Sequence, residues 1–398
     1  MIMELNHGQQ IAVEKYYDFI KHPERRKRPW FEISGAAGTG KTTTVKEAIK
    51  YVGFDEHLVS YMAYVGKATL ALRLTGLDAR TIHSMIYELI TTYERDKYGD
   101  IVYYHGQKKL IHKFVKKEEL DKDYQQFVVD EGGMVGEAIG RDILSYGIPT
   151  MILGDLNQLP PVMAKRIFLS EPDVELTEIM RQSKDSPIIQ LSQKAKFGLP
   201  IRYGVYGDNE CIVIPKSALT DEHLMESDIV ICETNALRDH INLYMRSNIQ
   251  GIHDNHIVPG DKLICRQNKW AIKLNDDIAL VNGLIGYVTA VYKESRTPGC
   301  SMDIQFKPEF TQDKFKRLPV DQRYPFLPYD QRAAIKNLKT NKILFEFGNC
   351  ITCHLAQGSQ YDTVLVYVEG TKSRQSLYFR QWLYTAITRA KKKLILVI

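Results

Sequence analysis

The sequence predicts an α/β protein with two or more domains. Its 398 residues exceed the size at which a single hydrophobic core usually stops growing. Signals for a strand, a loop and a helix follow one another after residue 30 and again after residue 227. A third region, residues 263–340, carries short strand signals separated by prolines and by the turn pair Asn282-Gly283.

The composition is that of an ordinary globular protein, with 44% hydrophobic and 25% charged residues. No apolar stretch reaches 18 residues and the N-terminus lacks a signal-peptide run, so we expect a cytoplasmic chain without membrane contact. There are six cysteines, and five of them are spread too widely to suggest a disulfide framework. The formal charge of +5 gives weak support for a polyanionic partner.

A basic run, "ERRKR" at 24–28, stands between Pro23 and Pro29. Such a run serves as an address, as a phosphate patch or, most often, as a solvated loop. The flanking prolines favour the solvated loop.

The stretch "GAAGTGKT" fits the phosphate-loop pattern G-x-x-x-x-G-K-[ST] in full. A short strand at 30–33 precedes it, and apolar residues at helical spacing follow it. Glycines let the backbone wrap around phosphate, and the helix N-terminus faces the anion. We expect Lys41 to reach the β- and γ-phosphates and Thr42 to hold Mg²⁺.

We expect strands near residues 31, 59, 127 and 151, and the last two end in polar residues. "FVVDE" ends in Asp130 and Glu131, which suit Mg²⁺ binding and proton abstraction from water, respectively. "TMILGDLNQLPP" carries Gln158, whose amide can hydrogen-bond the γ-phosphate or its water.

These stretches resemble motifs I, II and III of superfamily 1 helicases, most closely the RecD-like and Dda-like branch. Other stretches resemble the family's remaining motifs, in the family's order, between residues 5 and 397. They are "LNHGQQIA" (the leading glutamine motif), "GKATLALRLTG" (motif Ia) and "TIHSMI" (the segment after it), "LTEIMRQ" (motif IV), "ETNALRDHIN" (the Thr-Asn element), "ITCHLAQGSQYDTVLV" (motif V) and "LYTAITRAKKKLILV" (motif VI).

The resemblance implies an ATP-dependent DNA helicase that moves 5′ to 3′ along single-stranded DNA and unwinds duplex. It implies that nucleotide binds between two domains and that hydrolysis uses a shared set of side chains. The catalytic set is Lys41, Asp130, Glu131, Gln158, Arg181 and Arg389. The nucleotide set is Gln9, on the adenine, with Gly35, Gly38, Thr39, Gly40, Lys41, Thr42, Thr43 and Gly358, and the metal ligands are Thr42 and Asp130. The nucleic-acid set is Lys67, Thr81, His83, Thr234, Asn235, Asn282, Thr352 and His354.

The same resemblance implies two tandem RecA-like domains, each with an insertion. Domain 1A takes residues 1–84 and 124–181, with a hairpin insertion, 1B, at 85–123 that serves as a strand-separating pin. Domain 2A takes residues 182–262 and 341–398, with an SH3-like β-barrel, 2B, at 263–340. We expect a monomer that engages single-stranded and forked DNA and works with replication or recombination proteins.

Three positions depart from the family pattern. Gly132-Gly133 replace an Ala or Cys followed by Ser, which predicts a looser loop without a coupling hydroxyl. Leu355 replaces a Lys, which removes one expected DNA contact. Met180 replaces an aromatic residue that would stack on adenine.

The stretch 349–363 also contains C-x-x-C-H, the spacing of a c-type haem attachment and half of a zinc site. In a strand, Cys350, Thr352 and His354 would face one side and Cys353 the other. The cysteines would then diverge, and no second C-x-x-C completes a zinc site. We therefore predict neither haem nor metal here; His354 is a DNA contact or a core histidine.

Two other functions remain open. One is a nucleic-acid-binding ATPase or translocase that does not unwind duplex, and the other is a P-loop kinase for a small molecule. The kinase would need neither motifs V and VI nor a second α/β domain. The residues alone do not separate DNA from RNA, because contacts to the backbone suit both.

Overall fold

The chain forms two compact units in a computed structural model, and each is described by itself. One contains residues 1–64, 75–156 and 160–178, and the other contains residues 65–74, 157–159 and 179–398. The structure describes residues 5–36, 38–96, 98–104, 107–108, 110–161, 164–178, 186–274, 278–293, 302–336, 342–371, 373 and 375–398.

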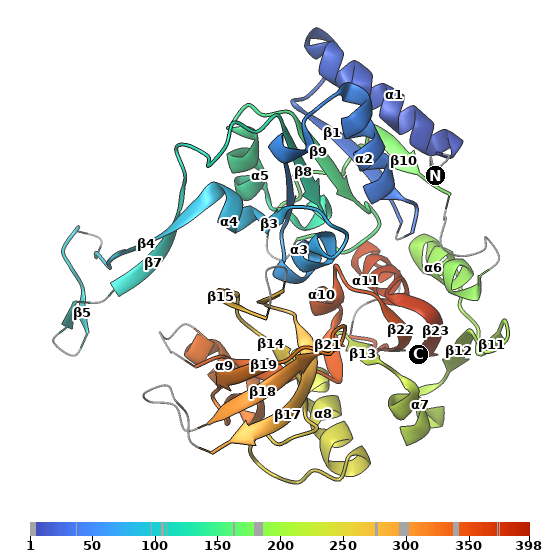
Figure 1. Ribbon diagram of the computed structural model, residues 1–398. Coiled ribbons are helices and arrows are strands. Elements are labelled where there is room, and N and C mark those ends of the chain that lie inside the picture. The colour runs from blue at the N-terminus through green and yellow to red at the C-terminus, as the bar shows by residue number, and fades with distance from the viewer. Residues whose placement is uncertain are drawn as a thin grey trace. The chain divides into compact units, whose positions relative to one another are not determined.

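The first unit is built on a six-stranded parallel sheet with the order β10-β1-β9-β8-β2-β3 (Figure 1). Its strands are β1 (Trp30–Gly35), β2 (Val59–Ala63), β3 (Ala79–Thr81), β8 (Gln126–Asp130), β9 (Thr150–Gly154) and β10 (Val174–Leu176). The predicted strands near residues 31, 59, 127 and 151 are confirmed. Strands β3 and β10 were missed, because three residues are too short to show a period.

The helices of this unit begin and end where local signals stand. Asn6 caps α1 by accepting a 2.8 Å hydrogen bond from the Gln9 amide, and α2 ends at Gly53, whose φ is +84°. Ile143 of α5 packs with Phe127 and Ile152 of the sheet. The helices are α1 (His7–Lys21), η1 (Pro23–Arg25), α2 (Lys41–Val52), η2 (Glu56–Leu58), α4 (Ile82–Ile86), η3 (Gly132–Met134) and α5 (Glu137–Leu144).

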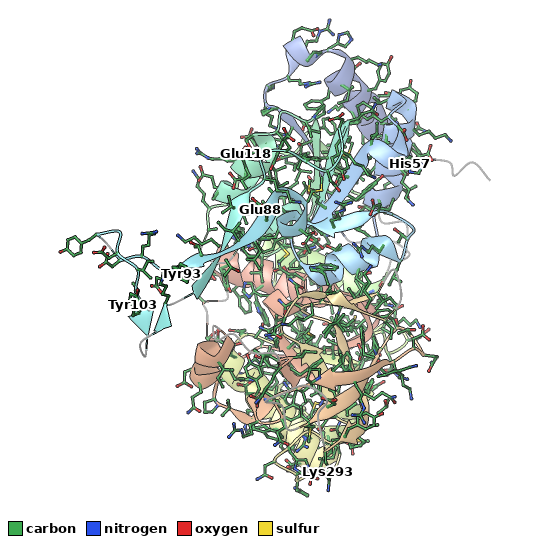
Figure 2. All side chains as sticks on the ribbon, turned by 60° about the vertical axis from the view of Figure 1, so that its left-hand side comes forward. His57, Glu88, Tyr93, Tyr103, Glu118 and Lys293 are labelled. Atoms are coloured by element: carbon green, nitrogen blue, oxygen red, sulfur yellow. The ribbon has the colours of Figure 1, made fainter. Side chains whose placement is uncertain are left out.

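A two-stranded ribbon leaves the first sheet after α4. Strands β4 (Tyr87–Tyr93) and β7 (Leu110–Lys116) pair antiparallel, and β5 (Tyr103–Tyr104) with β6 (Gln107–Lys108) forms a smaller pair beyond them. Figure 2 shows Tyr93 and Tyr103 on this ribbon, far from the sheet that carries it. Leu89 and Phe114 are 57% and 58% exposed, so the ribbon offers apolar side chains to solvent.

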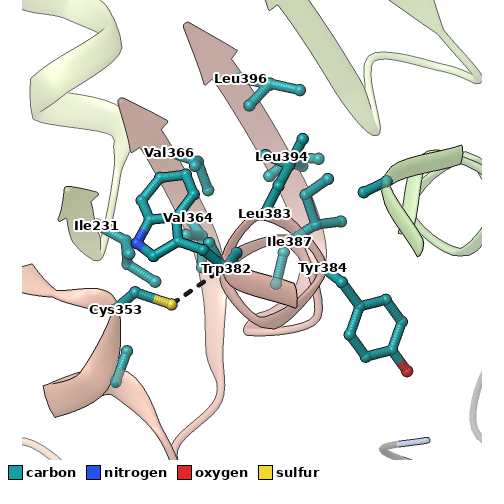
Figure 3. Packing of buried hydrophobic residues seen from close by; sticks show 14 of the residues in the cluster. Ile231, Cys353, Val364, Val366, Trp382, Leu383, Tyr384, Ile387, Leu394 and Leu396 are labelled. Atoms are coloured by element: carbon teal, nitrogen blue, oxygen red, sulfur yellow. Dashed lines mark hydrogen bonds between the residues drawn. The ribbon is translucent and has the colours of Figure 1, made fainter. Parts of the chain in front are cut away.

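The second unit contains a six-stranded sheet with the order β11-β12-β23-β22-β13-β21, parallel except for β11. Figure 3 shows the packing of α11 residues such as Trp382 and Ile387 against Val364 and Leu394 of this sheet. The strands are β11 (Gly204–Tyr206), β12 (Cys211–Ile214), β13 (Ile229–Cys232), β21 (Cys350–Thr352), β22 (Tyr361–Tyr367) and β23 (Ala390–Val397). The helices are α3 (Gly66–Arg73), α6 (Pro187–Phe197), η4 (Lys216–Ala218), α7 (Asp221–Glu226), α8 (Asn235–Tyr244), η5 (Met245–Ile249), α10 (Cys353–Ala356) and α11 (Leu377–Ile387).

The same unit holds an antiparallel sheet with its own hydrophobic core and the order β19-β18-β17-β14-β20. The predicted turn at Asn282-Gly283 is confirmed, with φ of +89° at Gly283. The elements are β14 (Lys262–Cys265), β15 (Lys269–Lys273), β16 (Ala279–Leu280), β17 (Ile285–Tyr292), β18 (Asp303–Pro308), β19 (Phe315–Pro319), η6 (Tyr324–Phe326), α9 (Tyr329–Lys336) and β20 (Phe345–Phe347).

A buried ionic cluster joins the two sheets of the second unit. Arg238 on α8 is 1% exposed; its Nη1 lies 3.1 Å from Glu346 Oε2 on β20, and its Nη2 lies 2.7 Å from Asp239 Oδ1. Arg332 of α9 contacts Asp239, and Arg266 Nε lies 3.3 Å from Glu346 Oε2. Three cations thus share two carboxylates between α8, β20 and α9.

No helix within the described ranges is both long enough and apolar enough to cross a bilayer.

We predict that Glu346→Gln destabilises the second unit strongly. Removing the shared anion leaves Arg238 and its neighbours buried without full compensation, which costs about 3–5 kcal/mol. Guanidinium denaturation followed by circular dichroism measures this cost. The control is Asp362→Asn, which breaks exposed pairs with Lys391 and Lys392 and should leave the midpoint almost unchanged. Equal midpoint shifts in the two variants would contradict the structural role of the cluster.

Candidate active site

The glycine loop between β1 and α2 has a backbone that only glycine allows. Gly38 and Gly40 have φ of +86° and +79°, in the left-handed region. A Cβ on Gly35 would lie 2.5 Å from Thr39 Oγ1, so this position also requires glycine. The loop leads directly into the first turn of α2, which holds Lys41, Thr42 and Thr43. These residues fit a phosphate group, because the backbone N–H groups and the helix N-terminus are close together.

Two predicted side chains reach this loop. Lys41 Nζ donates to the carbonyl oxygens of Gly35 at 2.6 Å and Ala36 at 3.0 Å. Gln9 on α1 is 3% exposed, and its Nε2 donates to the Thr39 carbonyl at 3.2 Å. The structure therefore places Gln9 against the loop, as expected for a residue beside the nucleotide.

Asp130 shares the electrostatic environment of Lys41. It ends β8, two strands from β1 in the parallel sheet, so both side chains lie at the carboxyl edge. Burial raises the pKa of the Asp130 carboxyl, while the positive charge of Lys41 opposes that shift. The next residue, Glu131, has φ of +52°, an uncommon conformation for a side chain of this size. Strain of this kind clusters at functional sites.

The departure Gly132-Gly133 lies in the single turn η3, where both glycines are buried. A Cβ on Gly132 would lie 2.3 Å from Ile152 Cγ2 and 3.2 Å from the Leu153 carbonyl oxygen. A Cβ on Gly133 would meet nothing closer than 3.7 Å. Close packing of the turn against β9 therefore explains Gly132.

Residues 157–159, which include Gln158, contact motifs V and VI in the second unit. The Leu159 amide donates to Thr385 Oγ1 on α11 at 3.0 Å, and Gln357 Nε2 donates to the Leu159 carbonyl at 3.3 Å. Gln158 itself is 6% exposed. The sequence did not indicate that Gln357 and Thr385 hold this segment, although both residues lie within the stretches that resemble motifs V and VI.

Arg389 lies at the amino edge of the second sheet, just before β23. It is 2% exposed, with Nε donating to the Thr385 carbonyl at 3.0 Å and Nη1 to the Ser359 carbonyl at 3.1 Å. The guanidinium is thus held by its own unit. The other predicted arginine, Arg181, and the departure at Met180 lie outside the described residues.

The nucleic-acid residues predicted in the first unit lie near the base of the ribbon. Thr81 caps α4 by accepting from the Ser84 amide at 3.2 Å. The ring of His83 packs against those of Tyr87 and Phe114, at centroid distances of 5.5 and 5.1 Å, and these two rings are 6.3 Å from each other. Burial lowers the pKa of His83, which keeps its ring neutral and suited to stacking.

Thr234 and Asn235 follow β13 at the carboxyl edge of the second sheet. Thr234 Oγ1 accepts from the Leu237 amide at 3.2 Å and donates its proton to Glu369 Oε1 at 2.7 Å. Asn235 Oδ1 accepts from Arg238 Nη1 at 3.0 Å, which fixes the direction of its NH₂ group. No sequence pattern indicated Glu369 or Arg238 as supports of this loop.

Three other predicted contacts are engaged inside the second unit. Lys67 Nζ donates to the Tyr361 hydroxyl at 3.0 Å. Gly358 has φ of +72°, and a Cβ there would lie 3.2 Å from Ala68 Cβ. The backbone N–H of Asn282 donates to Asn268 Oδ1 in the neighbouring loop at 2.8 Å.

The predicted strand through Cys353 and His354 is wrong beyond Thr352, where helix α10 begins. There, a hydrogen bond within the turn, from the Gln357 backbone amide to the His354 carbonyl, takes the place of hydrogen bonds between strands. The predicted divergence of the cysteines is confirmed. Cys350 Sγ lies 3.6 Å from Cys232 Sγ, whereas Cys353 Sγ lies 3.6 Å from the Trp382 carbonyl (Figure 3). Burial lowers the pKa of His354.

Comparisons with known proteins place this geometry in a family. The profile of the AAA domain matches residues 4–214, more than half of the chain, and that of the UvrD-like helicase C-terminal domain matches residues 347–397. The chain belongs to the AAA-domain family. Curated relatives that match the chain are named RecD2 and Dda, the branch of superfamily 1 helicases that the motifs resemble.

Two curated relatives and one solved structure illustrate the match. The ATP-dependent RecD2 DNA helicase of Deinococcus radiodurans is 24% identical over 388 residues, which cover 91% of this chain and 46% of that protein. The ATP-dependent DNA helicase Dda of phage T4 is 28% identical over 211 residues, or 49% of this chain and 43% of that one. This chain thus spans about half the length of the curated relatives it matches. Pif1 helicase from Bacteroides, solved with ADP-AlF3 and single-stranded DNA, has the same fold, with a TM-score of 0.53, 18% identity and coverage of 99% of this chain and 92% of that one.

We predict that Gly132→Ala destabilises the first unit by about 1–3 kcal/mol, because the new methyl group overpacks the contact with Ile152. Gly133→Ala is the matched control; its Cβ has room, so the variant should match or slightly exceed the parent in stability. Thermal unfolding of both variants provides the measurement. If the two variants unfold together, Gly132 is not required by packing.

Proposed function

We propose that this chain is an ATP-dependent DNA helicase that moves 5′ to 3′ along single-stranded DNA and unwinds duplex. The observation that carries the proposal is the shared site of Lys41 and Asp130 at the carboxyl edge of one parallel sheet, at the end of a glycine loop. Two relatives that match this chain, RecD2 and Dda, are named ATP-dependent DNA helicases, which supports the same activity here.

In this proposal, the loop from Gly35 to Thr43 and Lys41 bind the triphosphate of ATP, and Gln9 contacts the adenine. Mg²⁺, held by Thr42 and Asp130, would neutralise charge on the phosphates. Glu131 takes a proton from the attacking water, which Gln158 helps to orient. Arg181 and Arg389 stabilise the charge that develops on the γ-phosphate. Arg389 must then exchange its present carbonyl partners for phosphate oxygens.

The structural roles inferred from the resemblance also stay proposals. The ribbon of β4 and β7 corresponds to insertion 1B within 85–123, and the antiparallel sheet corresponds to the SH3-like 2B within 263–340. Domains 1A and 2A take the remaining bounds given above. The predicted nucleic-acid residues contact the DNA backbone, with Asn235 presenting an NH₂ group that Arg238 orients. We also propose that the protein acts as a monomer on forked DNA, with replication or recombination proteins as partners.

The decisive experiment uses duplexes with a 5′ or a 3′ single-stranded tail. We expect wild-type protein to unwind only the 5′-tailed duplex, with ATP turnover stimulated by single-stranded DNA. Glu131→Gln keeps the shape of the site but loses the base, so ATP should bind while turnover falls by roughly 10²–10⁴-fold. Lys41→Ala should lose both nucleotide affinity and turnover, because a phosphate contact disappears.

Each contrary result has a definite meaning. Stimulated turnover without unwinding of either duplex would support the alternative of a translocase that does not separate strands. Normal turnover in Glu131→Gln would place the base elsewhere. ATP turnover that single-stranded DNA does not stimulate would contradict helicase activity.

The ribbon should be needed for strand separation alone. It contains none of the residues assigned to ATP chemistry, and Tyr103 near its end is 60% exposed. Splitting a duplex requires breaking base stacking, about 1.4 kcal/mol per step, and a projecting ring can supply part of this at the junction. We predict that replacing residues 100–107 with an Asn-Gly turn abolishes unwinding and spares both DNA-stimulated ATP turnover and single-strand translocation.

The result is read from unwinding and ATP turnover measured on the same preparation. Normal unwinding by the shortened protein would show that the ribbon is structural. A parallel fall in ATP turnover would assign the ribbon to DNA gripping or to the fold.

A further inference from the structure

A basic cavity of about 330 Å³ lies in the first unit where α1 ends and β1 begins. Five of its lining residues are cations: Lys15, Arg25, Arg26, Lys27 and Arg28. Four of them belong to the basic run that the sequence analysis interpreted as a solvated loop. In the structure, this run and Lys15 of α1 line the same cavity.

The cations of the cavity are only partly neutralised. Arg28 is paired twice, with its Nη2 2.7 Å from Asp173 Oδ2 and 3.3 Å from Oε2 of the buried Glu32. Arg25 Nε lies 3.6 Å from Glu24, but both side chains are more than 60% exposed, so water screens this pair. Asp18 is the other carboxylate in the lining. The cavity therefore keeps an excess of positive charge that an anion would balance.

Two arginines of the cavity are ordered before any ligand arrives. Arg26 Nε and Nη2 donate to the carbonyls of Phe19 at 2.5 Å and Ile20 at 3.3 Å, and its guanidinium lies 4.4 Å from the centre of the Phe19 ring. Arg28 lies 5.6 Å from the Trp30 ring centre. Fixing these side chains in advance lowers the entropy cost of binding a ligand.

The same stacking indicates which part of a nucleic acid would bind. Proteins that hold single strands offer aromatic faces on which the bases stack. Here guanidinium groups lie over the rings of Phe19 and Trp30, and Phe31 is only 3% exposed. The cavity offers charge without an open stacking surface, which suits phosphates rather than bases.

Exposed lysines and arginines bind a single anion weakly, because water and salt screen each pair. A ligand with many closely spaced phosphates gains from several such contacts at once. Duplex DNA carries one charge per about 1.7 Å of its axis, twice the density of one strand. Charge density thus favours a duplex over a free nucleotide or a single strand.

The cavity is also separate from the proposed site of ATP and single-stranded DNA. It lies at the start of β1, whereas the phosphate loop follows the end of that strand. The six residues of β1 are separated by five steps of about 3.3 Å, which put roughly 17 Å between these two edges of the sheet. Thr81, His83 and Asp130 all lie at or just beyond carboxyl ends of its strands.

We infer that this cavity is a second DNA site that binds the phosphate backbone of duplex DNA. The inference rests on the proposed function for the identity of the polymer as DNA. It adds a contact for the duplex at the edge of the sheet opposite the glycine loop.

The test compares two triple variants in binding a blunt fluorescent duplex of about two helical turns. The cavity variant is Lys15→Ala/Arg25→Ala/Lys27→Ala, which removes exposed cations and leaves the ordered Arg26 and Arg28 in place. The matched control is Lys50→Ala/Lys122→Ala/Arg141→Ala, which removes three exposed charges elsewhere on the same unit. Fluorescence anisotropy is measured over a range of salt concentrations.

We expect the cavity variant to bind duplex roughly tenfold more weakly and to reduce the slope of log K against log salt by about 2–3, because each phosphate contact contributes about 0.9. The control variant should bind duplex with nearly the affinity of the parent and with nearly the same salt slope. Affinity for single-stranded DNA and DNA-stimulated ATP turnover should stay at the wild-type level in both variants. Unchanged duplex binding in the cavity variant, or equal losses in the control, would overturn the inference.

Calorimetric titration with inorganic pyrophosphate separates a small anion from a polymer. Pyrophosphate binding that is lost in the cavity variant, with duplex binding unchanged, would overturn the duplex assignment. The failure of the proposed function has a different signature, since it would abolish DNA-stimulated turnover in the wild-type protein itself.

Discussion

Parallel pairing of strands is the constraint on which the site depends. Every connection between parallel strands must return the chain to the same edge, so each loop that follows a strand lies at the carboxyl edge. In the first sheet this brings together Lys41 after β1, Thr81 at the end of β3 and Asp130 at the end of β8. In the second sheet, Thr234 and Thr352 lie at the carboxyl edge, whereas Arg389 lies at the amino edge, before β23. The residues proposed for DNA and for ATP in the second unit are therefore separated by the length of its strands.

Backbone geometry around the acidic pair illustrates how closely the loops are packed. Glu131 adopts a left-handed conformation between Asp130, whose Oδ1 accepts from its amide at 2.9 Å, and a turn that has no room for a Cβ at Gly132. Such a conformation costs of order 1–3 kcal/mol, which surrounding contacts must offset. The buried packing of η3 against β9 provides those contacts. A strained carboxylate held by a rigid turn is suited to act at a fixed point.

Many predicted DNA ligands already bond within their own unit. Lys67 donates to Tyr361, Thr234 to Glu369, and Asn235 accepts from Arg238. These bonds order the side chains in advance, which would lower the entropy cost of the proposed binding. Arg238 has a double role, since it orients Asn235 and belongs to the buried ionic cluster with Glu346. Stability of the second unit and geometry of its loop at 234–235 thus depend on the same guanidinium.

The sequence by itself determined the features that depend on local chemistry. The glycine loop, the strands that precede Lys41 and Asp130, and the turn at Asn282-Gly283 each follow from a few adjacent residues, and their flanking apolar runs were long enough to show a period. Tertiary structure decided the rest. The short strands β3 and β10 exist because longer neighbours pair with them, and the strand expected through Cys353 ends at Thr352 because the chain turns into α10. The close contact of Gly132 with Ile152 and the ionic cluster of Arg238 with Glu346 join residues that are far apart in the chain. No periodicity records such contacts, because they depend on distances in space rather than on spacing in sequence.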